Sequence, residues 1–272
     1  MKKPIFIPAS ITERHKMKKP IYVPKGRARE YSPLAMDIWN GCDHGCTYCF
    51  NNVGNKKFSD EPKVLPNLIE RLQAQLASEE IRDQVLLTFS GDPYCHAEMK
   101  EEITKHVLET FNTWNVPVAI LTKGGHRCLR DIRLFKKFNN IKVGATIVLT
   151  DKDDCKKWEP NATTFQDRVD TLWTLHNAGI QTWLSLEPVI DPEQACEVIC
   201  QTHEFVDAYK IGKLNHYPEA DLVDWEKFVR KVTALLRYLK KSFYIKNDLA
   251  EVVSESFFRP EERDSDAMAL RN

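Results

Sequence analysis

Apolar residues occur along the chain in two patterns, short continuous runs and sets spaced three or four residues apart. The runs predict buried strands, and the spaced sets predict helices with one apolar face. From residue 34 onward the two kinds of segment alternate. Strands are expected at 34–39, 85–89, 116–121, 141–149, 181–186, 205–211 and 243–246. Helices are expected at 65–76, 103–114, 128–138, 169–176, 193–202 and 225–239.

Strands that are apolar throughout and alternate with helices are typical of a parallel sheet covered by helices, an α/β fold. An open doubly wound sheet and a barrel-like wrap both satisfy the pattern. Both bind ligands at the carboxyl ends of the strands, so function is expected there. We expect this domain over 31–254, a basic, proline-containing arm over 1–30, and a polar, frayed tail over 255–272.

The composition excludes several classes of protein. The 272 residues are 42% hydrophobic and 29% charged, as in globular proteins and unlike disordered or fibrous chains. No apolar run approaches the roughly 18 residues of a membrane span, and the first residues lack the apolar core of a signal peptide. Eight cysteines without such a signal favour a reducing compartment, where clustered cysteines bind metal more often than they form disulfides. A cytoplasmic protein is therefore expected.

The charges are balanced overall but unevenly distributed. The chain has 39 basic and 39 acidic residues, yet residues 1–30 hold nine Lys/Arg and two Glu, a net charge of +7. Such an arm can contact an anionic partner such as nucleic acid. A solvated leader that binds nothing is the alternative.

Three of the cysteines form a C-x3-C-x2-C motif directly after the first expected strand. They are Cys42, Cys46 and Cys49, on a loop that also contains glycines. Thiolate ligands select zinc or iron–sulfur centres. Three thiolates can hold three corners of a four-iron, four-sulfur (4Fe–4S) cube and leave one iron open. A structural zinc needs four ligands, with His44 as the nearby candidate, so a non-catalytic zinc-binding module is the alternative.

The motif, with Tyr48 before its last cysteine, resembles the signature of the radical S-adenosylmethionine (radical SAM) enzymes. The resemblance implies a partial (β/α)6 TIM-like barrel in which the open iron binds S-adenosylmethionine and Tyr48 lies beside the adenine. It also implies that the reduced cluster cleaves this cofactor to methionine and a 5′-deoxyadenosyl radical, which abstracts hydrogen from a substrate. A reducing partner of the flavodoxin or ferredoxin type is expected with it.

Later strand ends resemble the spore photoproduct lyase and DNA repair photolyase-like branch of that superfamily. Ser90-Gly91-Asp92, after the second strand, occupies the place of the segment that receives the methionine amino group. Lys123 matches a lysine that pairs with the cofactor's carboxylate, and Thr146 a hydroxyl residue near the cofactor. The stretch from Glu159 to Arg168 also parallels the lyase. Glu187, after the fifth strand, is expected to line the same cavity and to bind the cofactor or the substrate there.

Two positions bear on hydrogen transfer. Cys95 lies a few residues past Gly91, about where the lyase carries a cysteine that returns a hydrogen atom, which predicts a catalytic relay there. The lyase's tyrosine after its last cluster cysteine is Phe50 here, which has no O–H group to relay hydrogen. The resemblance therefore predicts the cofactor chemistry but does not identify the substrate. A nucleic-acid lesion or modified base is expected first, and a peptide or small molecule is the alternative.

Overall fold

The computed structural model describes residues 18–52 and 59–272. Its main sheet has eight strands in the order β1-β2-β5-β6-β7-β8-β9-β10, of which β1 is antiparallel to β2 and the other seven are parallel. The strands are β1 (Ile21–Tyr22), β2 (Leu34–Met36), β5 (Val85–Leu87), β6 (Val118–Thr122), β7 (Ile141–Thr146), β8 (Gln181–Val189), β9 (Ala208–Lys213) and β10 (Ser242–Ile245). The predicted parallel α/β architecture is confirmed.

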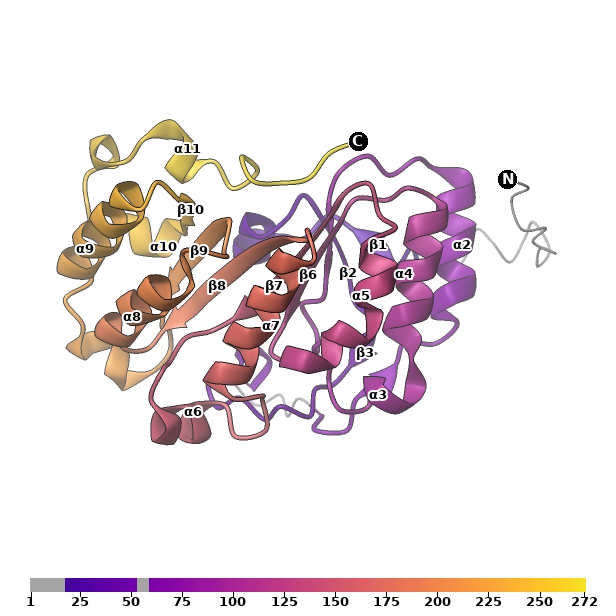
Figure 1. Cartoon of the computed structure of the whole chain (residues 1–272), viewed down its shortest axis with the longest axis horizontal. Coiled ribbons are helices and arrows are strands. Elements are labelled where there is room, and N and C mark those ends of the chain that lie inside the picture. The colour runs from indigo at the N-terminus through magenta and orange to yellow at the C-terminus, as the bar shows by residue number, and fades with distance from the viewer. Residues whose placement is uncertain (1–17, 53–58) are drawn as a thin grey trace.

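Helices connect successive parallel strands and cover one face of the sheet (Figure 1). Each predicted helix is present, although 128–138 is a 3-10 helix followed by one α-helical turn. The helices are α2 (Leu68–Ser78), α3 (Glu98–Glu101), α4 (Ile103–Thr113), η3 (Gly125–Asp131), α5 (Ile132–Phe135), α6 (Lys152–Trp158), α7 (Phe165–Asn177), α8 (Pro192–Thr202), α9 (Trp225–Tyr238), α10 (Asn247–Ala250) and α11 (Pro260–Arg263). Within the described residues, no helix is both long and apolar enough to cross a bilayer.

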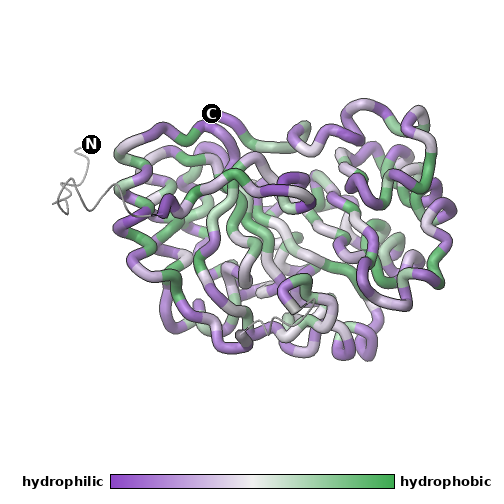
Figure 2. The backbone as a smooth tube through the Cα atoms, turned by 180° about the vertical axis from the view of Figure 1, so that it is seen from behind, coloured by the Kyte–Doolittle hydropathy of each residue, from purple (hydrophilic) through white to green (hydrophobic). Residues whose placement is uncertain are grey.

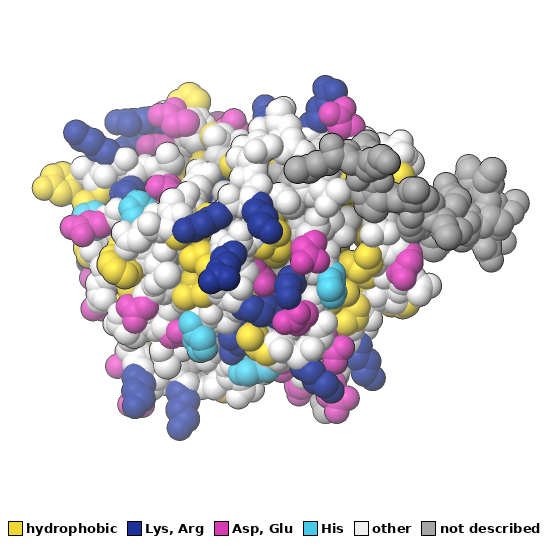
Figure 3. All heavy atoms as spheres, turned by 45° about the vertical axis from the view of Figure 1, so that its right-hand side comes forward, with side chains coloured by type: hydrophobic (Ala, Val, Ile, Leu, Met, Phe, Trp, Pro, Cys, Tyr) yellow, Lys and Arg dark blue, Asp and Glu magenta, His cyan; other side chains and the backbone are white. Residues whose placement is uncertain are grey.

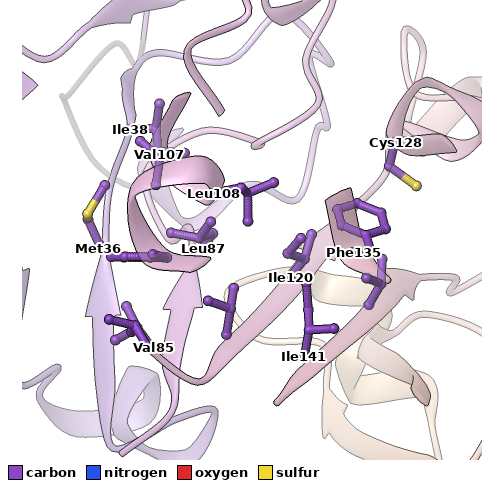
Figure 4. Packing of buried hydrophobic residues seen from close by; sticks show 14 of the residues in the cluster. Met36, Ile38, Val85, Leu87, Val107, Leu108, Ile120, Cys128, Phe135 and Ile141 are labelled. Carbon is purple, nitrogen blue, oxygen red and sulfur yellow. The ribbon is translucent and has the colours of Figure 1, made fainter. Parts of the chain in front are cut away.

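The apolar faces of the longer helices α2, α4, α7, α8 and α9 pack on the outer face of the sheet. Met36 and Val85 on adjacent strands lie with Leu87, Val107 and Leu108 in one buried cluster between the sheet and α4 (Figure 4). Burying each such side chain contributes about 1.5–3 kcal/mol. Apolar segments accordingly follow the central strands, and polar ones the outer helices (Figure 2).

The expected strand 34–39 is divided in two. Leu34–Met36 belongs to the main sheet, whereas β3 (Trp39–Asn40) pairs with β4 (Lys63–Val64) in a separate two-stranded sheet. This division lies directly before the loop with the three cysteines. Apolar periodicity alone did not indicate it, because both halves are buried.

The described part of the N-terminal arm packs on the barrel and is not a solvated leader. After β1, the 3-10 helix η1 (Gly26–Glu30) crosses to the opposite edge of the sheet. The carboxylate of Glu30 is buried and accepts hydrogen bonds from the Tyr244 hydroxyl (2.7 Å) and the Asn247 N–H (2.8 Å). This segment therefore spans the side of the barrel between β1 and β10. Residues 1–17 of the expected arm lie outside the described residues.

The prediction of a frayed C-terminal tail is wrong. The tail runs across the amino ends of the strands (Figure 1), where the Leu270 carbonyl accepts a hydrogen bond from the Gln84 N–H (3.1 Å). Two lysines inside the barrel, Lys142 and Lys210, donate to tail carbonyls at 2.5 and 3.0 Å. Buried ammonium groups require acceptors, and the polar tail supplies them.

Candidate active site

A cavity of about 550 Å³ opens at the carboxyl ends of the parallel strands, a volume usual for ligand sites. One sequence-predicted residue, Cys95, is absent from its lining and is fully buried. All the other predicted site residues line the cavity: Cys42, Cys46, Tyr48, Cys49, Ser90, Gly91, Asp92, Lys123, Thr146 and Glu187.

The loop with the three cysteines is held by backbone hydrogen bonds on both sides. The Cys42 N–H donates to the Ser59 carbonyl (3.0 Å), and the Thr47 N–H donates to the Trp158 carbonyl (2.9 Å). Gly41 has φ +112°, and a Cβ there would lie 2.8 Å from the Ser59 oxygen. The loop is thus fixed so that all three thiols face one cavity.

The chemistry of these thiols fits a metal centre. Burial raises the pKa of Cys46 to about 11 and also raises that of Cys42, so the free thiols are neutral at physiological pH. A coordinating cation reverses this effect, because the thiolate is the form that binds. The cavity therefore penalises bare thiolates and leaves metal binding as the way to stabilise them.

The spacing of the thiols argues against zinc. Among the described residues, three ligand atoms within 4.8 Å of one another occur at Asp43, His44 and His96, and not at the cysteines. A tetrahedral zinc ion with Zn–S bonds of about 2.3 Å holds its ligand atoms about 3.8 Å apart. An iron–sulfur cube, in which each cysteine binds a different iron, requires wider spacing.

His44, the expected fourth zinc ligand, is engaged elsewhere. The Arg127 guanidinium contacts His44 Nε2 at 2.7 Å and His96 Nε2 at 3.1 Å. Burial, together with the nearby charge of Arg127, lowers the pKa of His44 to about 4 although Asp92 opposes the shift, so the ring is neutral and accepts this hydrogen bond. A guanidinium at this position also repels a cation from the Asp43, His44 and His96 group.

Two aspartates shape the loop after β5. Asp37 Oδ1 accepts hydrogen bonds from the Phe89 and Ser90 N–H groups at 2.8 and 2.6 Å. Asp92 accepts from the Thr122 hydroxyl (2.5 Å) and the Lys123 N–H (2.7 Å), which joins this loop to the end of β6. Asp92, expected to meet the cofactor's ammonium group, is therefore also a positioning residue.

The neighbouring Gly91 is required by sterics. It has φ +98°, and a Cβ there would lie 2.6 Å from the Gly41 carbonyl oxygen and 3.0 Å from Trp39 Cβ. The loop after β5 thus lies against the start of the cysteine loop.

Tyr48 is held by a buried network that reaches Thr146. Its hydroxyl donates to Glu159, which pairs with Arg168, and Arg168 Nη1 donates to the Thr146 carbonyl (2.7 Å). Burial disfavours the ionised form of Glu159, but the charges of Arg168 and Lys123 outweigh it, so the pKa of Glu159 lies below its usual value. This network ties the cysteine loop to the end of β7.

Lys123 presents a cation to the cavity. Its Nζ lies 5.5 Å from the centroid of the Tyr48 ring, and no carboxylate of the described chain is within 4 Å of it. Burial would lower the pKa of Lys123, but the carboxylates of Glu159 and Asp92, and the Cys46 thiolate when it forms, raise it overall. The side chain is therefore charged and available to an anionic ligand.

Glu187 faces the opposite half of the cavity. The β8–β9 register is irregular between Leu186 and Val189, and irregularities of this kind redirect side chains near active sites. Lys246 Nζ donates to both Glu187 oxygens at 2.9 and 2.8 Å, and the Tyr31 hydroxyl donates to the same carboxylate. Glu187 is thus neutralised within the protein, by residues outside the cysteine loop and outside the ends of β5, β6 and β7.

Sequence reasoning missed several functional positions. Asp37, Arg127, Tyr31 and Lys246 act through partners more than fifty residues away, so no local spacing indicates them. The one local signal is the charged Asp37 within an otherwise apolar strand segment.

The model of the Radical SAM superfamily matches residues 36–206. An uncharacterised protein of Methanocaldococcus jannaschii, MJ0683, is 28% identical over 238 residues, which cover 82% of this chain and 88% of that protein.

Two solved structures share the fold. Spore photoproduct lyase complexed with a dinucleoside spore photoproduct has a TM-score of 0.62 at 11% identity, covering 82% of this chain and 78% of the lyase. Streptococcus suis SuiB bound to S-adenosylmethionine has a TM-score of 0.57 at 13% identity, covering 78% of this chain and 46% of SuiB.

Proposed function

Since this chain belongs to the radical SAM superfamily, we propose that it binds a 4Fe–4S cluster through Cys42, Cys46 and Cys49 and uses it with S-adenosylmethionine to abstract hydrogen from a nucleic-acid lesion or modified base. Members of the superfamily use an iron–sulfur cluster and S-adenosylmethionine. The observation that carries the proposal is the single cavity lined by the three thiols and by the residues expected to hold the cofactor.

The iron–sulfur cluster is proposed to supply the electron for the reaction. A cluster held by Cys42, Cys46 and Cys49 would supply, once reduced, the electron for cleavage of S-adenosylmethionine to methionine and a 5′-deoxyadenosyl radical, which would remove a hydrogen atom from the substrate. An external reductant is needed, and we propose a flavodoxin or ferredoxin-like protein.

The residues of this chain bind and orient the cofactor. Lys123 offers an unpaired ammonium group to the methionine carboxylate. Backbone groups at Ser90 and Gly91, fixed by Asp37 and Asp92, are suited to receive the methionine amino group. Tyr48 presents an aromatic face for the adenine.

The substrate proposal is supported by charge and by fold. The cavity mouth carries lysines that make no ion pair with any described residue, and the fold resembles that of a lyase solved with a dinucleoside photoproduct. SuiB, solved with a precursor peptide, has a similar fold (TM-score 0.60), so a peptide substrate is the second candidate.

Anaerobic reconstitution tests the cofactor chemistry. The protein should bind iron and acid-labile sulfide, and dithionite with S-adenosylmethionine should yield 5′-deoxyadenosine. Cys46→Ala should lose both properties. Cys200→Ala, at an exposed cysteine outside the cavity lining, should keep them.

The zinc alternative gives a different result. A zinc module would be colourless, would lack iron and sulfide, and would lose its metal in His44→Ala. Absence of 5′-deoxyadenosine from iron-loaded protein would refute the proposed function. Transfer of deuterium from a labelled oligonucleotide into 5′-deoxyadenosine tests the substrate.

A further inference from the structure

The cavity has a second half that the cofactor residues do not use. The cysteine loop and the ends of β5, β6 and β7 supply the residues proposed to hold the cluster and S-adenosylmethionine. The ends of β8, β9 and β10, with the segment 24–31, supply the rest of the lining. A substrate must occupy this second half, so its side chains indicate the class of substrate.

Basic groups in this half differ in whether they are already neutralised. Lys246 pairs with Glu187, and Arg27 pairs with Asp248 at 2.6 Å. Lys25 and Lys213 also line the cavity, and neither makes an ion pair with any described residue. Asp60 also lines the cavity but makes no ion pair with either lysine, and two ammonium groups left unpaired in this way favour an anionic ligand.

This arrangement is local and does not reflect a generally basic surface. On the face seen in Figure 3, acidic and basic side chains are interspersed. The chain as a whole carries no net charge. The unpaired lysines at the cavity mouth are therefore a local feature of this site and not part of a generally basic surface.

An exposed aromatic ring lies at the same mouth. Phe50 lines the cavity with 63% of its surface exposed, although a phenylalanine normally buries its ring. The loop that follows β9 lies beside the cysteine loop, because the Tyr217 hydroxyl donates to the Thr47 carbonyl. The Phe50 ring thus comes from the cysteine loop, and the Lys213 ammonium group from the end of the strand that leads into the adjacent loop.

We infer that the mouth binds a single-stranded or extruded nucleotide unit, with a base stacked on Phe50 and the flanking phosphates held by Lys25 and Lys213. Aromatic stacking combined with an electrostatic groove is the usual way of holding single-stranded nucleic acid. The inference rests on the proposed function and specifies the form in which the nucleic acid enters. Duplex DNA keeps its bases stacked inside and offers none to Phe50.

The test measures binding by the full-length, cluster-loaded protein of a fluorescent oligonucleotide of about 12 nucleotides, within the usual site sizes. We expect the single strand to bind more tightly than its duplex. Phe50→Ala should weaken binding of the single strand by roughly 5- to 100-fold. The double variant Lys25→Ala, Lys213→Ala should lower the slope of log Kobs against log salt by about 1.4.

Matched controls separate these effects from general charge and hydrophobicity. Tyr238→Ala removes an exposed aromatic ring outside the cavity lining. Lys136→Ala with Lys137→Ala removes two exposed lysines at the opposite end of the barrel. Both should bind as the wild type does. Residues 1–17 are present in every variant, so they do not contribute to the differences.

Several outcomes would overturn the inference. Equal binding of duplex and single strand with no effect of Phe50→Ala would do so, as would a salt slope unchanged in the lysine variant. Competition by polyglutamate as effective as by the unlabelled oligonucleotide would indicate an acidic peptide instead. Because 5′-deoxyadenosine formation is measured separately, these results are distinguishable from failure of the proposed function.

Discussion

Arg168 and Glu159 form an ion pair inside the protein, with Nη2 and Oε2 2.5 Å apart and each side chain only 1% exposed. The same carboxylate accepts the Tyr48 hydroxyl, and Arg168 also donates to the Thr146 and Thr163 carbonyls. Charges at this depth are tolerated only when they are paired and hydrogen-bonded. The same ion pair therefore stabilises the folded protein and holds the Tyr48 side chain in place.

Replacing Glu159 with glutamine should destabilise the protein by about 3–5 kcal/mol, because it leaves the Arg168 charge buried without a counter-ion. Urea unfolding at neutral pH measures the change. The matched control is Glu226→Gln on the surface of α9, where the i,i+4 pair with Arg230 should be worth about 0.3–0.5 kcal/mol. A similar loss of unfolding free energy in both variants would show that the buried ion pair contributes no more to stability than the surface pair.

Alanine at Gly91 should be far more disruptive than alanine at Gly179. Both glycines have positive φ, +98° and +79°, but a Cβ at 179 meets nothing within 4 Å, whereas one at 91 meets backbone. Gly179→Ala should cost about 1–2 kcal/mol through φ strain alone. Gly91→Ala should cost more, and should also lower iron content and affinity for S-adenosylmethionine. Thermal unfolding and equilibrium dialysis check both expectations, and unchanged cofactor affinity in Gly91→Ala would contradict the second.

Stability should rise with pH through the buried lysines. Burial lowers the pKa of Lys142 to about 8, and burial with the charges of Lys142 and Lys246 lowers that of Lys210 to about 7, against partial opposition from Asp266 and Glu30. The unfolded chain keeps these protons to near 10.5, so above pH 7 it binds more protons than the folded state. The free energy of unfolding then rises by up to about 1.4 kcal/mol per pH unit and group.

The measurement compares wild type with Lys210→Met between pH 7 and 9.5. The variant lacks the titrating group, so the difference in unfolding free energy, wild type minus variant, should grow with pH. Lys136→Met, at an exposed lysine, should show a flat difference. A flat difference for Lys210→Met as well would mean that Lys210 keeps an ordinary pKa.

Cys95→Ala tests the expected hydrogen relay. Cys95 is fully buried in the apolar cluster behind the sheet, and burial raises its pKa to about 12. With no surface in the cavity, the thiol cannot reach a substrate there, so we expect the yield of product per 5′-deoxyadenosine to be unchanged. Loss of product with continued cleavage of S-adenosylmethionine would restore the relay role.

Much of the fold followed from local patterns. The helix expected over 169–176 ends at Asn177, close to the predicted boundary, and the Gly179 and Ile180 N–H groups donate to the carbonyls of His176 and Leu175. The C-terminal tail was predicted wrongly because local composition does not show which distant groups its backbone contacts. Its polar composition predicts exposure, but the acceptors that Lys142 and Lys210 need come from its backbone, which composition does not describe.

By itself, the sequence determined the order of strands and helices and the group of cysteines, because periodicity and ligand spacing are properties of neighbouring residues. Only the tertiary structure decided which distant polar groups pair with one another. Glu187 meets Lys246 and Glu159 meets Tyr48 across 59 and 111 residues, while Lys25 and Lys213 meet no acidic group among the described residues. Electrostatic pairing depends on distance in space, and the folding of the sheet into a barrel sets that distance.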